Sequence, residues 1–331
     1  MAIGPDRQKR PSRRRLLFAV GALALAAASV TATASLLPGS MGVAVGGQLP
    51  MHPPDSGPFD SPDILDGPPV SGPQPVVLSL PARPHLTVPI LYYHYIRDIH
   101  PTAQNQLSVA LSISPALFAQ QMALLHVEGA HPITLAMLMD ALDGTSALPA
   151  NPVVLTFDDG YADFATNVEP VMVRYGFVAT DYVVSGFLNR PRYMTAAQVQ
   201  EMDAAGMVIG SHTVHHVNLA NVSLPVAFAE IEGGKAALEQ LLGHPVLDFA
   251  YPCGGFDPAV EQLVLQAGFS DAVTTMGGDA QTLAARFELR RTELGGAPSL
   301  AAFAEDAGLP VPTRAQAAAI SAAVRPLGPL P

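Results

Sequence analysis

Short apolar runs alternate regularly with longer amphipathic stretches from residue 87 to residue 275. Apolar runs of this length predict buried strands, and the stretches between them have the spacing of helices with one apolar face. Strands that alternate with helices favour a parallel sheet, and this many units favours an α/β barrel or a distorted barrel. We expect strands at 87–96, 151–157, 177–184, 207–210, 246–251 and 270–275, and helices at 114–129, 165–176, 195–206, 226–243 and 258–268.

Residues 1–38 have the pattern of an export signal or of an N-terminal membrane anchor. Six of the 17 Lys and Arg residues lie within the first fifteen positions, and an apolar stretch follows directly. Ala32 to Ala34 provide small residues of the kind found at signal cleavage sites. The uncharged stretch 16–37 is also long enough to span a bilayer as an uncleaved anchor. Both alternatives predict that the rest of the chain lies outside the cytoplasm.

The remaining chain divides by composition into three parts. Residues 39–84 are dense in Pro and Gly, a composition that cannot form a core, and we expect a linker there. The folded domain is expected at 85–308, and the Ala- and Pro-rich residues 309–331 are expected to form a loosely attached tail. Without residues 1–34 the chain carries 11 Lys and Arg against 27 Asp and Glu. This negative charge disfavours nucleic acid as a partner.

An acidic pair ends one of the expected strands. VVLTFDDGYADF places Asp158 and Asp159 after an apolar run and directly before Gly160. In parallel α/β folds the carboxyl ends of the strands carry the chemistry. One interpretation is an ordinary strand-to-helix turn in which an aspartate caps the next helix. Adjacent carboxylates repel each other, however, unless a cation or a basic partner keeps at least one of them ionised. The pair therefore indicates a metal ion.

Two histidines follow a second expected strand end. His212 and His216 are four positions apart in GSHTVHHVNL, and on a helical turn this spacing brings both imidazoles to one side. Imidazole is a common ligand of zinc-like ions. A solvated loop that happens to contain histidines is the alternative, and His215 would point elsewhere on such a turn. Two histidines and a carboxylate would form a three-ligand site that leaves a coordination position for water.

Three ordered motifs, TFDDGY, SHTVHHVNL and FAYPCGGFDP, resemble those of the polysaccharide deacetylases, the NodB-homology domain of carbohydrate esterase family 4. The similarity extends over roughly residues 86 to 300. The resemblance implies an α/β fold, a distorted (β/α) barrel of the NodB-homology type, that removes acetyl groups from sugar residues with the help of a metal ion. It also implies that Asp159, His212 and His216 hold the metal and that Asp158 is the general base.

The same resemblance implies that the backbone N–H of Cys253, in YPCGG, is an oxyanion donor; an ordinary Pro-Gly turn is the alternative for this stretch. Cys253 is the single cysteine of the chain, so no internal disulfide can form. Its thiol is not expected to be a nucleophile, because the neighbouring sequence offers no basic group that would stabilise a thiolate. The chain contains no tryptophan, and Tyr161 and Tyr251 are therefore the candidates for the substrate groove.

The sequence departs from the family pattern at three places. Ala250 stands where most members have Arg, Val217 stands where most have Pro, and no histidine follows His244, so the usual C-terminal acid is absent. One branch of the family, the poly-N-acetylglucosamine and intercellular-adhesin deacetylases, has a catalytic histidine in its first strand, and LYYHYI resembles that element. We therefore expect His94 to be the general acid. A core histidine bonded to a backbone carbonyl is the alternative.

The same branch has an arginine in a late strand, which ELRRTEL resembles at Arg291. We expect Arg291 to replace the arginine missing at position 250 and to keep Asp158 ionised by charge pairing. A surface salt bridge is the alternative for Arg291.

Together these features predict an extracytoplasmic, metal-dependent N-deacetylase of an N-acetylglucosamine polymer. One divalent ion is expected; zinc is favoured, and cobalt, nickel or iron(II) would suit the same donors. Exopolysaccharide is favoured over peptidoglycan or chitin, and residues 16–37 could tether the chain to a membrane. Two other functions stay open: a catalytically silent carbohydrate-binding or assembly protein on the same fold, and an acetyl-ester esterase acting on xylan-like polymers.

Overall fold

The computed structural model describes residues 85–324. The expected export segment or anchor, the expected linker and the last residues of the expected tail lie outside the described residues. Within 85–324, no helix combines the length and the apolar character needed to cross a membrane.

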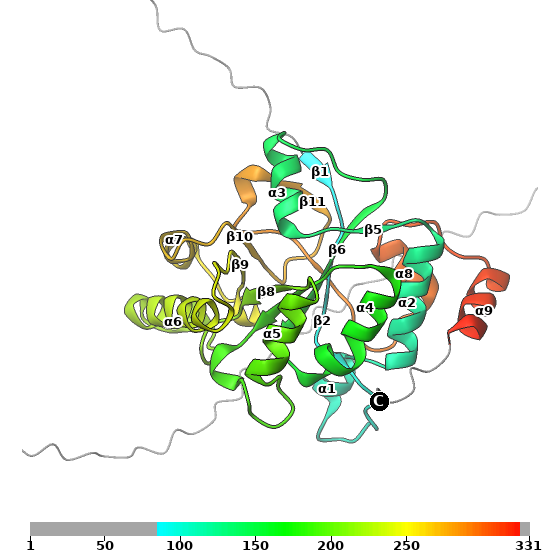
Figure 1. The fold of residues 1–331 in the computed structure, drawn as a ribbon, viewed down its shortest axis with the longest axis horizontal. Coiled ribbons are helices and arrows are strands. Elements are labelled where there is room, and N and C mark those ends of the chain that lie inside the picture. The colour runs from blue at the N-terminus through cyan, green and yellow to red at the C-terminus, as the bar shows by residue number, and fades with distance from the viewer. Residues whose placement is uncertain (1–84, 325–331) are drawn as a thin grey trace, which may run out of the picture. The chain divides into compact units, whose positions relative to one another are not determined.

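A parallel sheet forms the centre of the domain (Figure 1). Its strands lie in the order β10-β9-β8-β7-β6-β2-β12, and each neighbouring pair in this order is parallel. All the expected strands are present, and a short additional strand, β5 (His131–Pro132), pairs with the start of β6. The strands of the main sheet are β2 (Ile90–Tyr93), β6 (Pro152–Asp159), β7 (Thr180–Val183), β8 (Val208–Ser211), β9 (Asp248–Ala250), β10 (Asp271–Val273) and β12 (Thr292–Glu293).

Residues 289–294 close this sheet into a distorted barrel. At one end of the segment, Leu289 forms a parallel bridge with Val273 of the edge strand β10. At the other end, β12 pairs with β2, and the N–H of Leu294 donates to the carbonyl of Tyr92 over 2.9 Å. One stretch of chain therefore connects the two edges of the sheet, and the distorted (β/α) barrel expected from the sequence is confirmed.

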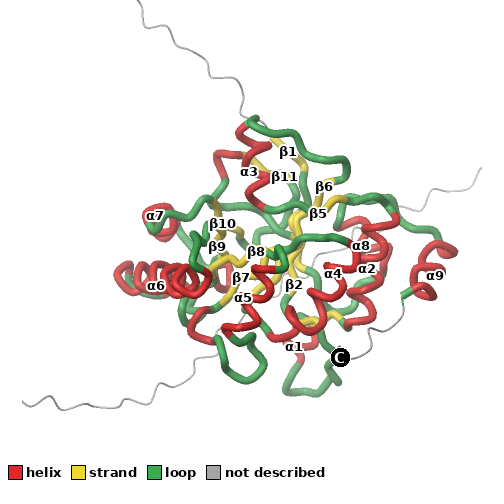
Figure 2. Tube along the Cα trace, in the orientation of Figure 1, coloured by secondary structure: helices red, strands yellow, loops and turns green. Residues whose placement is uncertain are grey.

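Helices surround the sheet and connect most of its strands (Figures 1 and 2). The second helix begins where its sequence indicates, because the Ser114 side chain accepts from the N–H of Leu117 and Pro115 occupies the first turn. The helices are α1 (Gln106–Ala110), α2 (Pro115–Val127), α3 (Leu135–Asp143), α4 (Glu169–Tyr175), α5 (Ala196–Ala204), α6 (Leu224–Leu242), α7 (Pro258–Gln266), α8 (Leu300–Asp306) and α9 (Arg314–Ala323).

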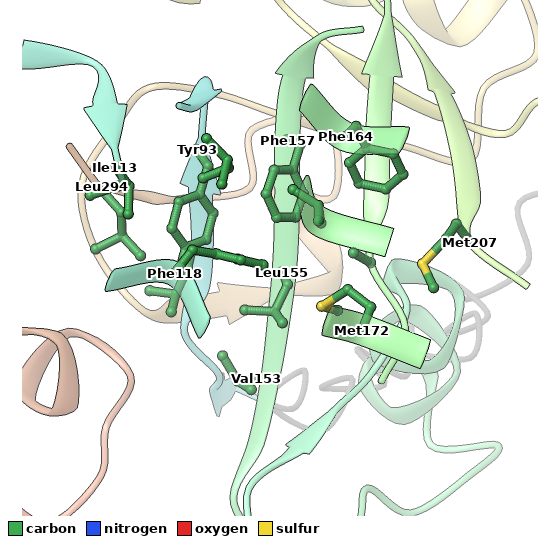
Figure 3. Packing of buried hydrophobic residues seen from close by; sticks show 14 of the residues in the cluster. Tyr93, Ile113, Phe118, Val153, Leu155, Phe157, Phe164, Met172, Met207 and Leu294 are labelled. Atoms are coloured by element: carbon green, nitrogen blue, oxygen red, sulfur yellow. The ribbon is translucent and has the colours of Figure 1, made fainter. Parts of the chain in front are cut away.

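Two apolar clusters fill the domain, one on each face of the sheet. Alternate residues of β6 divide between them, because Leu155 and Phe157 pack outward against the helices whereas Val154 points into the barrel. Figure 3 shows part of the outer cluster, in which the rings of Tyr93 and Phe157 stack with their centroids 5.0 Å apart. The inner cluster is closed by α3, which contributes Leu135, Leu138 and Leu142.

The expected strand 87–96 is interrupted at His94. β2 ends at Tyr93, and the next residues form β3 (Tyr95–Ile96), which leaves the main sheet and pairs with β4 (Ser112–Ile113). This break places His94 at the carboxyl end of β2. Two further strands, β1 (His85–Thr87) and β11 (Ala280–Thr282), pair antiparallel beside α3, at the end of the domain opposite α1 (Figure 1).

The expectation of a loosely attached tail after Leu309 is wrong for the part that the structure describes. Residues Arg314–Ala323 form α9, which begins with a capping box. Ile320 is buried in the outer cluster, and Ser321 Oγ donates to Gln120 Oε1 of α2 over 2.9 Å. A capped helix that buries an apolar side chain therefore forms in spite of the proline-rich composition around it.

Candidate metal centre

Three side chains that can bind a metal meet at the carboxyl ends of β6 and β8. Asp159 is the last residue of β6, His212 follows β8 directly, and His216 lies just after the next turn. Asp159 Oδ1 lies 3.6 Å from His212 Nε2 and 3.2 Å from His216 Nε2. The three ligand atoms all lie within 4.8 Å of one another. The structure thus brings together the residues that the family resemblance implied as metal ligands.

The donor set fits a divalent ion of the zinc type. Asp159 Oδ1 is buried without a hydrogen-bond partner among the described residues, which suits an atom that binds a cation. His212 Nδ1 lies 2.8 Å from the carbonyl oxygen of Ala250, a contact that leaves Nε2 as the ligand nitrogen. Ligands about 2.0–2.1 Å from a tetrahedral ion stand roughly 3.3 Å apart, close to the two separations from Asp159 Oδ1.

Burial and neighbouring charges bring two of these side chains into the forms that bind a metal. Burial and the charge of His216 lower the pKa of His212 to about 4, so its imidazole is neutral at neutral pH. Burial would raise the pKa of Asp159, but His216, whose Nε2 lies 3.2 Å from its Oδ1, and the charge of His212 hold it below its usual range. A neutral imidazole and an ionised carboxylate are the metal-binding forms of these side chains.

The two histidines do not share a helical turn, which corrects the geometry expected from their spacing. Thr213 and His216 have left-handed backbone angles, with φ of 66° and 57°. Thr213 Oγ1 accepts from the N–H of His216 over 3.0 Å, and the rings of His212 and His216 lie 4.8 Å apart. A tight turn stabilised by a side chain therefore brings the two rings together. His215 lies outside the cluster, with 59% of its side chain exposed.

Arg291 forms a buried, bidentate ion pair with Asp158. Its Nη1 and Nη2 donate to the two carboxylate oxygens over 2.7 and 2.8 Å, and its Nε donates to the carbonyl of Thr274 over 2.9 Å. Arg291 is only 1% exposed, so the alternative of a surface salt bridge is wrong. Burial would raise the pKa of Asp158, but Arg291 holds it below its usual range, and the carboxylate stays ionised.

His94 lies beside Asp158 at the mouth of the barrel. The register pairs Tyr93 with Phe157, so the next residues on the two strands, His94 and Asp158, are neighbours at the strand ends. The charge of His94 also contributes to the lowered pKa values of Asp158 and Asp159. His94 Nδ1 is buried and has no hydrogen-bond partner among the described residues. The alternative of a core histidine bonded to a carbonyl therefore finds no support at this nitrogen.

Cys253 lies in the short helical turn Pro252–Gly254 that follows β9. Its backbone is left-handed, with φ of 55°. Desolvation and the negative charge of Asp159 raise the pKa of the exposed Cys253 thiol, which keeps its sulfur protonated. The thiol is therefore a poor nucleophile, in agreement with the sequence.

Tyr251 does not line a groove, which corrects the expectation for this residue. Its side chain is 1% exposed and belongs to the outer apolar cluster. The ring contacts Phe249 edge-on at 5.2 Å and stacks on Phe256 at 4.6 Å. The pleat of β9 turns Tyr251 toward the helices, because residues two apart on a strand share a face and Phe249 points outward.

Tyr161 is half-buried near the metal centre, and two tyrosines that the sequence did not single out flank it. The hydroxyl oxygens of Tyr95 and Tyr161 lie 3.0 Å apart, and the ring of Tyr193 stacks on that of Tyr161 at 4.9 Å. Burial and the charge of Asp159 raise the pKa of Tyr161. The position of Tyr95 next to His94 was the one local signal for this cluster, since Tyr193 comes from a distant loop.

Comparisons with known proteins point to one family. Residues 145–272 match the family model described as polysaccharide deacetylase. The matched stretch contains the acidic pair, both ligand histidines and Cys253, whereas His94 and Arg291 lie outside it. The resemblance stated from the sequence motifs is thereby confirmed.

Individual relatives are similar at low identity. The chain is 26% identical over 216 residues to YxkH of Bacillus subtilis strain 168, which is provisionally named a polysaccharide deacetylase; the match covers 65% of this chain and 74% of YxkH. It is 29% identical over 119 residues to the poly-beta-1,6-N-acetyl-D-glucosamine N-deacetylase of Escherichia coli K12, which is 31% of this chain and 18% of that protein. The solved structure of the Streptococcus pyogenes deacetylase PplD in complex with acetate matches with a TM-score of 0.59 and 28% identity, over 64% of this chain and 93% of PplD.

Proposed function

We propose that this chain, which contains a polysaccharide deacetylase domain, is a metal-dependent hydrolase that removes N-acetyl groups from an N-acetylglucosamine-containing polysaccharide outside the cytoplasm. The observation that carries the proposal is the convergence of Asp159, His212 and His216 beside the buried pair of Asp158 and Arg291. A binding module has no need for an ionised carboxylate next to a three-ligand site. The arrangement therefore favours catalysis over a silent carbohydrate-binding protein.

The ligand triad would hold one divalent ion. Such an ion would act as a Lewis acid toward the acetyl carbonyl and toward the attacking water. Zinc is favoured for two imidazoles and a carboxylate, and cobalt, nickel or iron(II) would suit the same donors.

The proton transfers belong to the protein side chains. Asp158, kept ionised by Arg291, accepts the proton that the attacking water loses as its oxygen bonds to the acetyl carbon. The N–H of Cys253 donates to the carbonyl oxygen as negative charge develops there. His94, in its protonated form, donates to the sugar nitrogen as the carbon–nitrogen bond breaks. The products are acetate and a free amine.

Two observations support the substrate and the location. The similarity to the Escherichia coli poly-beta-1,6-N-acetyl-D-glucosamine N-deacetylase favours an exopolysaccharide over peptidoglycan or chitin. The basic and apolar N-terminal residues favour secretion, or attachment to the outer face of the cytoplasmic membrane through residues 16–37. Recovery of the chain in the cytosolic fraction of cells would contradict this location.

The direct test is acetate release by the full-length chain, first stripped of metal and then supplied with zinc, cobalt or nickel. Beta-1,6-linked N-acetylglucosamine oligomers, chitin oligomers and acetylated xylan are offered separately, with Asp159→Ala as the control. We expect metal-restored release from the beta-1,6-linked oligomers that is absent in the control. Release from xylan alone would establish the esterase alternative. Metal binding without release from any of the three substrates would contradict the proposed hydrolase.

A further inference from the structure

Helix α6 holds the turn that carries the two ligand histidines through one side chain, Glu230. Glu230 Oε2 accepts from the backbone N–H groups of Val214 and His215 over 3.1 and 2.8 Å. Glu230 Oε1 lies 2.8 Å from His215 Nδ1. The Glu230 side chain is only 12% exposed, whereas the His215 side chain that it contacts is 59% exposed. The carboxylate therefore binds the middle of the turn between His212 and His216.

Two glycines let α6 approach this turn closely. A Cβ atom at Gly234 would stand 2.9 Å from the carbonyl carbon of Thr213, and one at Gly233 would stand 3.0 Å from Val214 Cγ2. Glycine inside a helix costs about 1 kcal/mol relative to alanine, so two adjacent glycines in the middle of α6 are unfavourable for the helix itself. Close packing against the ligand turn accounts for them.

The opposite side of the turn is also fixed. The N–H of Ser185 donates to the carbonyl of Thr213 over 3.1 Å, and the N–H of Gly186 donates to the carbonyl of Val214 over 3.0 Å. A Cβ atom at Gly186 would lie only 2.4 Å from that Val214 oxygen. The segment after β7 thus satisfies the carbonyls of the turn, while Glu230 satisfies its N–H groups.

The backbone of the turn needs such support. Thr213 and His216 adopt left-handed angles, which non-glycine residues rarely do and which persist when surrounding contacts over-determine them. A relaxed turn would move His216, and its Nε2 would leave the position 3.2 Å from Asp159 Oδ1. Metal affinity depends on this distance because the ligands must meet at one point.

We propose that Glu230 is a positioning residue that fixes the metal-binding geometry of His212 and His216 without contacting the metal or the substrate. The proposal rests on the metal site of the proposed function. His215, which the sequence left as a bystander, extends the anchor by presenting its ring to the same carboxylate. Groups that orient metal ligands in this way typically contribute 10- to 100-fold to metal affinity.

The test measures zinc affinity of the full-length chain by competition with a chelator, with no acetylated substrate present. The variants are Glu230→Ala, Glu230→Gln and His215→Ala. The matched control is Glu232→Gln, an exposed glutamate on the same helix. We expect Glu230→Ala to weaken zinc binding by roughly 10- to 100-fold, Glu230→Gln and His215→Ala to weaken it less, and Glu232→Gln to leave it unchanged. The visible spectrum of the cobalt-loaded chain should shift in the same order, since it reports ligand geometry.

Near-ultraviolet circular dichroism and urea denaturation show whether each variant is folded. A folded Glu230→Ala chain with wild-type zinc affinity and an unchanged cobalt spectrum would overturn the proposal. If Glu230→Ala does not fold, Glu230→Gln decides, because it keeps one acceptor oxygen and loses only the charge; wild-type affinity in that variant would equally overturn the proposal. A wild-type chain that binds zinc but releases no acetate would contradict the proposed function and leave the role of Glu230 standing.

Discussion

The guanidinium of Arg291 lies between an acid and two aromatic rings. Beside its bidentate contact with Asp158, its Cζ atom lies 4.2 Å from the ring centroid of Tyr92 and 5.7 Å from that of Tyr182. Removing one partner of a buried ion pair leaves an uncompensated charge, which is far more costly than replacing both partners. The stability of the barrel mouth therefore depends on the pair rather than on either residue alone.

Replacing Arg291 by Met should lower the free energy of unfolding by about 3–5 kcal/mol. Adding Asp158→Asn to the same chain should recover part of this loss, because no charge is then buried without a partner. Urea denaturation of the single and double variants measures both effects. Arg290→Met, at the exposed neighbouring position, should change stability by about 0.5 kcal/mol or less. A double variant less stable than Arg291→Met would show that the pairing is not the stabilising feature.

His94 is predicted to act on protons and not on the metal. His94→Ala should lower the turnover number for N-acetylglucosamine oligomers by roughly 10²- to 10⁴-fold, because the leaving nitrogen then lacks its acid. Zinc content, measured on the same samples by elemental analysis, should stay unchanged. His126→Ala, on the exposed side of α2, serves as the control. Near-normal turnover of His94→Ala would remove this residue from the mechanism.

At the scale of elements, β8 is shaped by the side chain of the strand beside it. Gly210 of β8 lies opposite Tyr182 of β7 in the parallel register. A Cβ atom at Gly210 would stand 2.5 Å from Tyr182 Cδ1 and 3.2 Å from the carbonyl oxygen of Asp248. The tyrosine ring thus occupies the space that a side chain on β8 would fill. Because Gly210 has no side chain, β8 can lie close to the Tyr182 ring of β7, and this packing positions His212 at the end of β8.

Gly210→Ala should therefore destabilise the domain by about 1–3 kcal/mol through overpacking against the Tyr182 ring. Gly277→Ala is the matched control, because a Cβ atom there meets nothing within 4 Å. The loss is measured as a shift in the urea denaturation midpoint. Combining Gly210→Ala with Tyr182→Leu should cost less than the sum of the two single changes, since the shorter side chain relieves the clash. Strictly additive effects would contradict this packing.

Considered as a whole, the domain buries two acids whose pKa values are raised by burial. Asp248 of β9 and Asp271 of β10 are register neighbours. Burial raises the pKa of Asp248 to about 6. Burial and the charge of Asp248 raise the pKa of Asp271 well above its usual range, although Arg286 opposes the shift. The Tyr182 hydroxyl is buried and has no hydrogen-bond partner among the described residues. Burial and the charges of Asp248 and Asp271 raise its pKa.

The stability of the domain should accordingly contain a contribution from Asp248 that falls as the pH rises. A carboxyl with a raised pKa in the folded state stabilises the fold fully below its unfolded pKa, and this contribution is lost as the pH rises through the folded value of about 6. Asp248→Asn removes the titration. The variant should therefore gain stability relative to the wild type between about pH 4 and about pH 7, by up to about 3 kcal/mol.

Denaturation of both chains across this pH range, with a chelator present throughout, measures the difference. Asp279→Asn, at an exposed position, should show no pH-dependent difference from the wild type. Titrating groups that Asp248 does not influence cancel in the comparison because both chains contain them, whereas Asp271, whose pKa the charge of Asp248 raises, does not. A stability difference that stays constant with pH would mean that Asp248 titrates normally in the folded state.

Features that depend on near neighbours could be predicted from the amino-acid sequence. The alternation of apolar runs predicted the main-sheet strands from β2 to β10 and the helices α2, α4, α5, α6 and α7, but not β12. The cap at Ser114 and the proline at 115 predicted the start of α2. Strand ends are equally local, so the sequence also placed Asp158, Asp159 and His212 at the carboxyl edge where the structure has them. These predictions succeed because periodicity and turn chemistry act over a few residues.

Which distant side chains meet, and which way they face, depends on contacts between elements far apart in the chain. Arg291 reaches Asp158 across 133 positions of sequence, because residues 289–294 close the barrel between β10 and β2. The turn at His212 to His216, the burial of Tyr251 and the packing of α9 likewise follow from contacts with elements far along the chain. Glu230 gave no signal in the sequence for the same reason. A local pattern specifies an element, but barrel closure and close packing specify its neighbours.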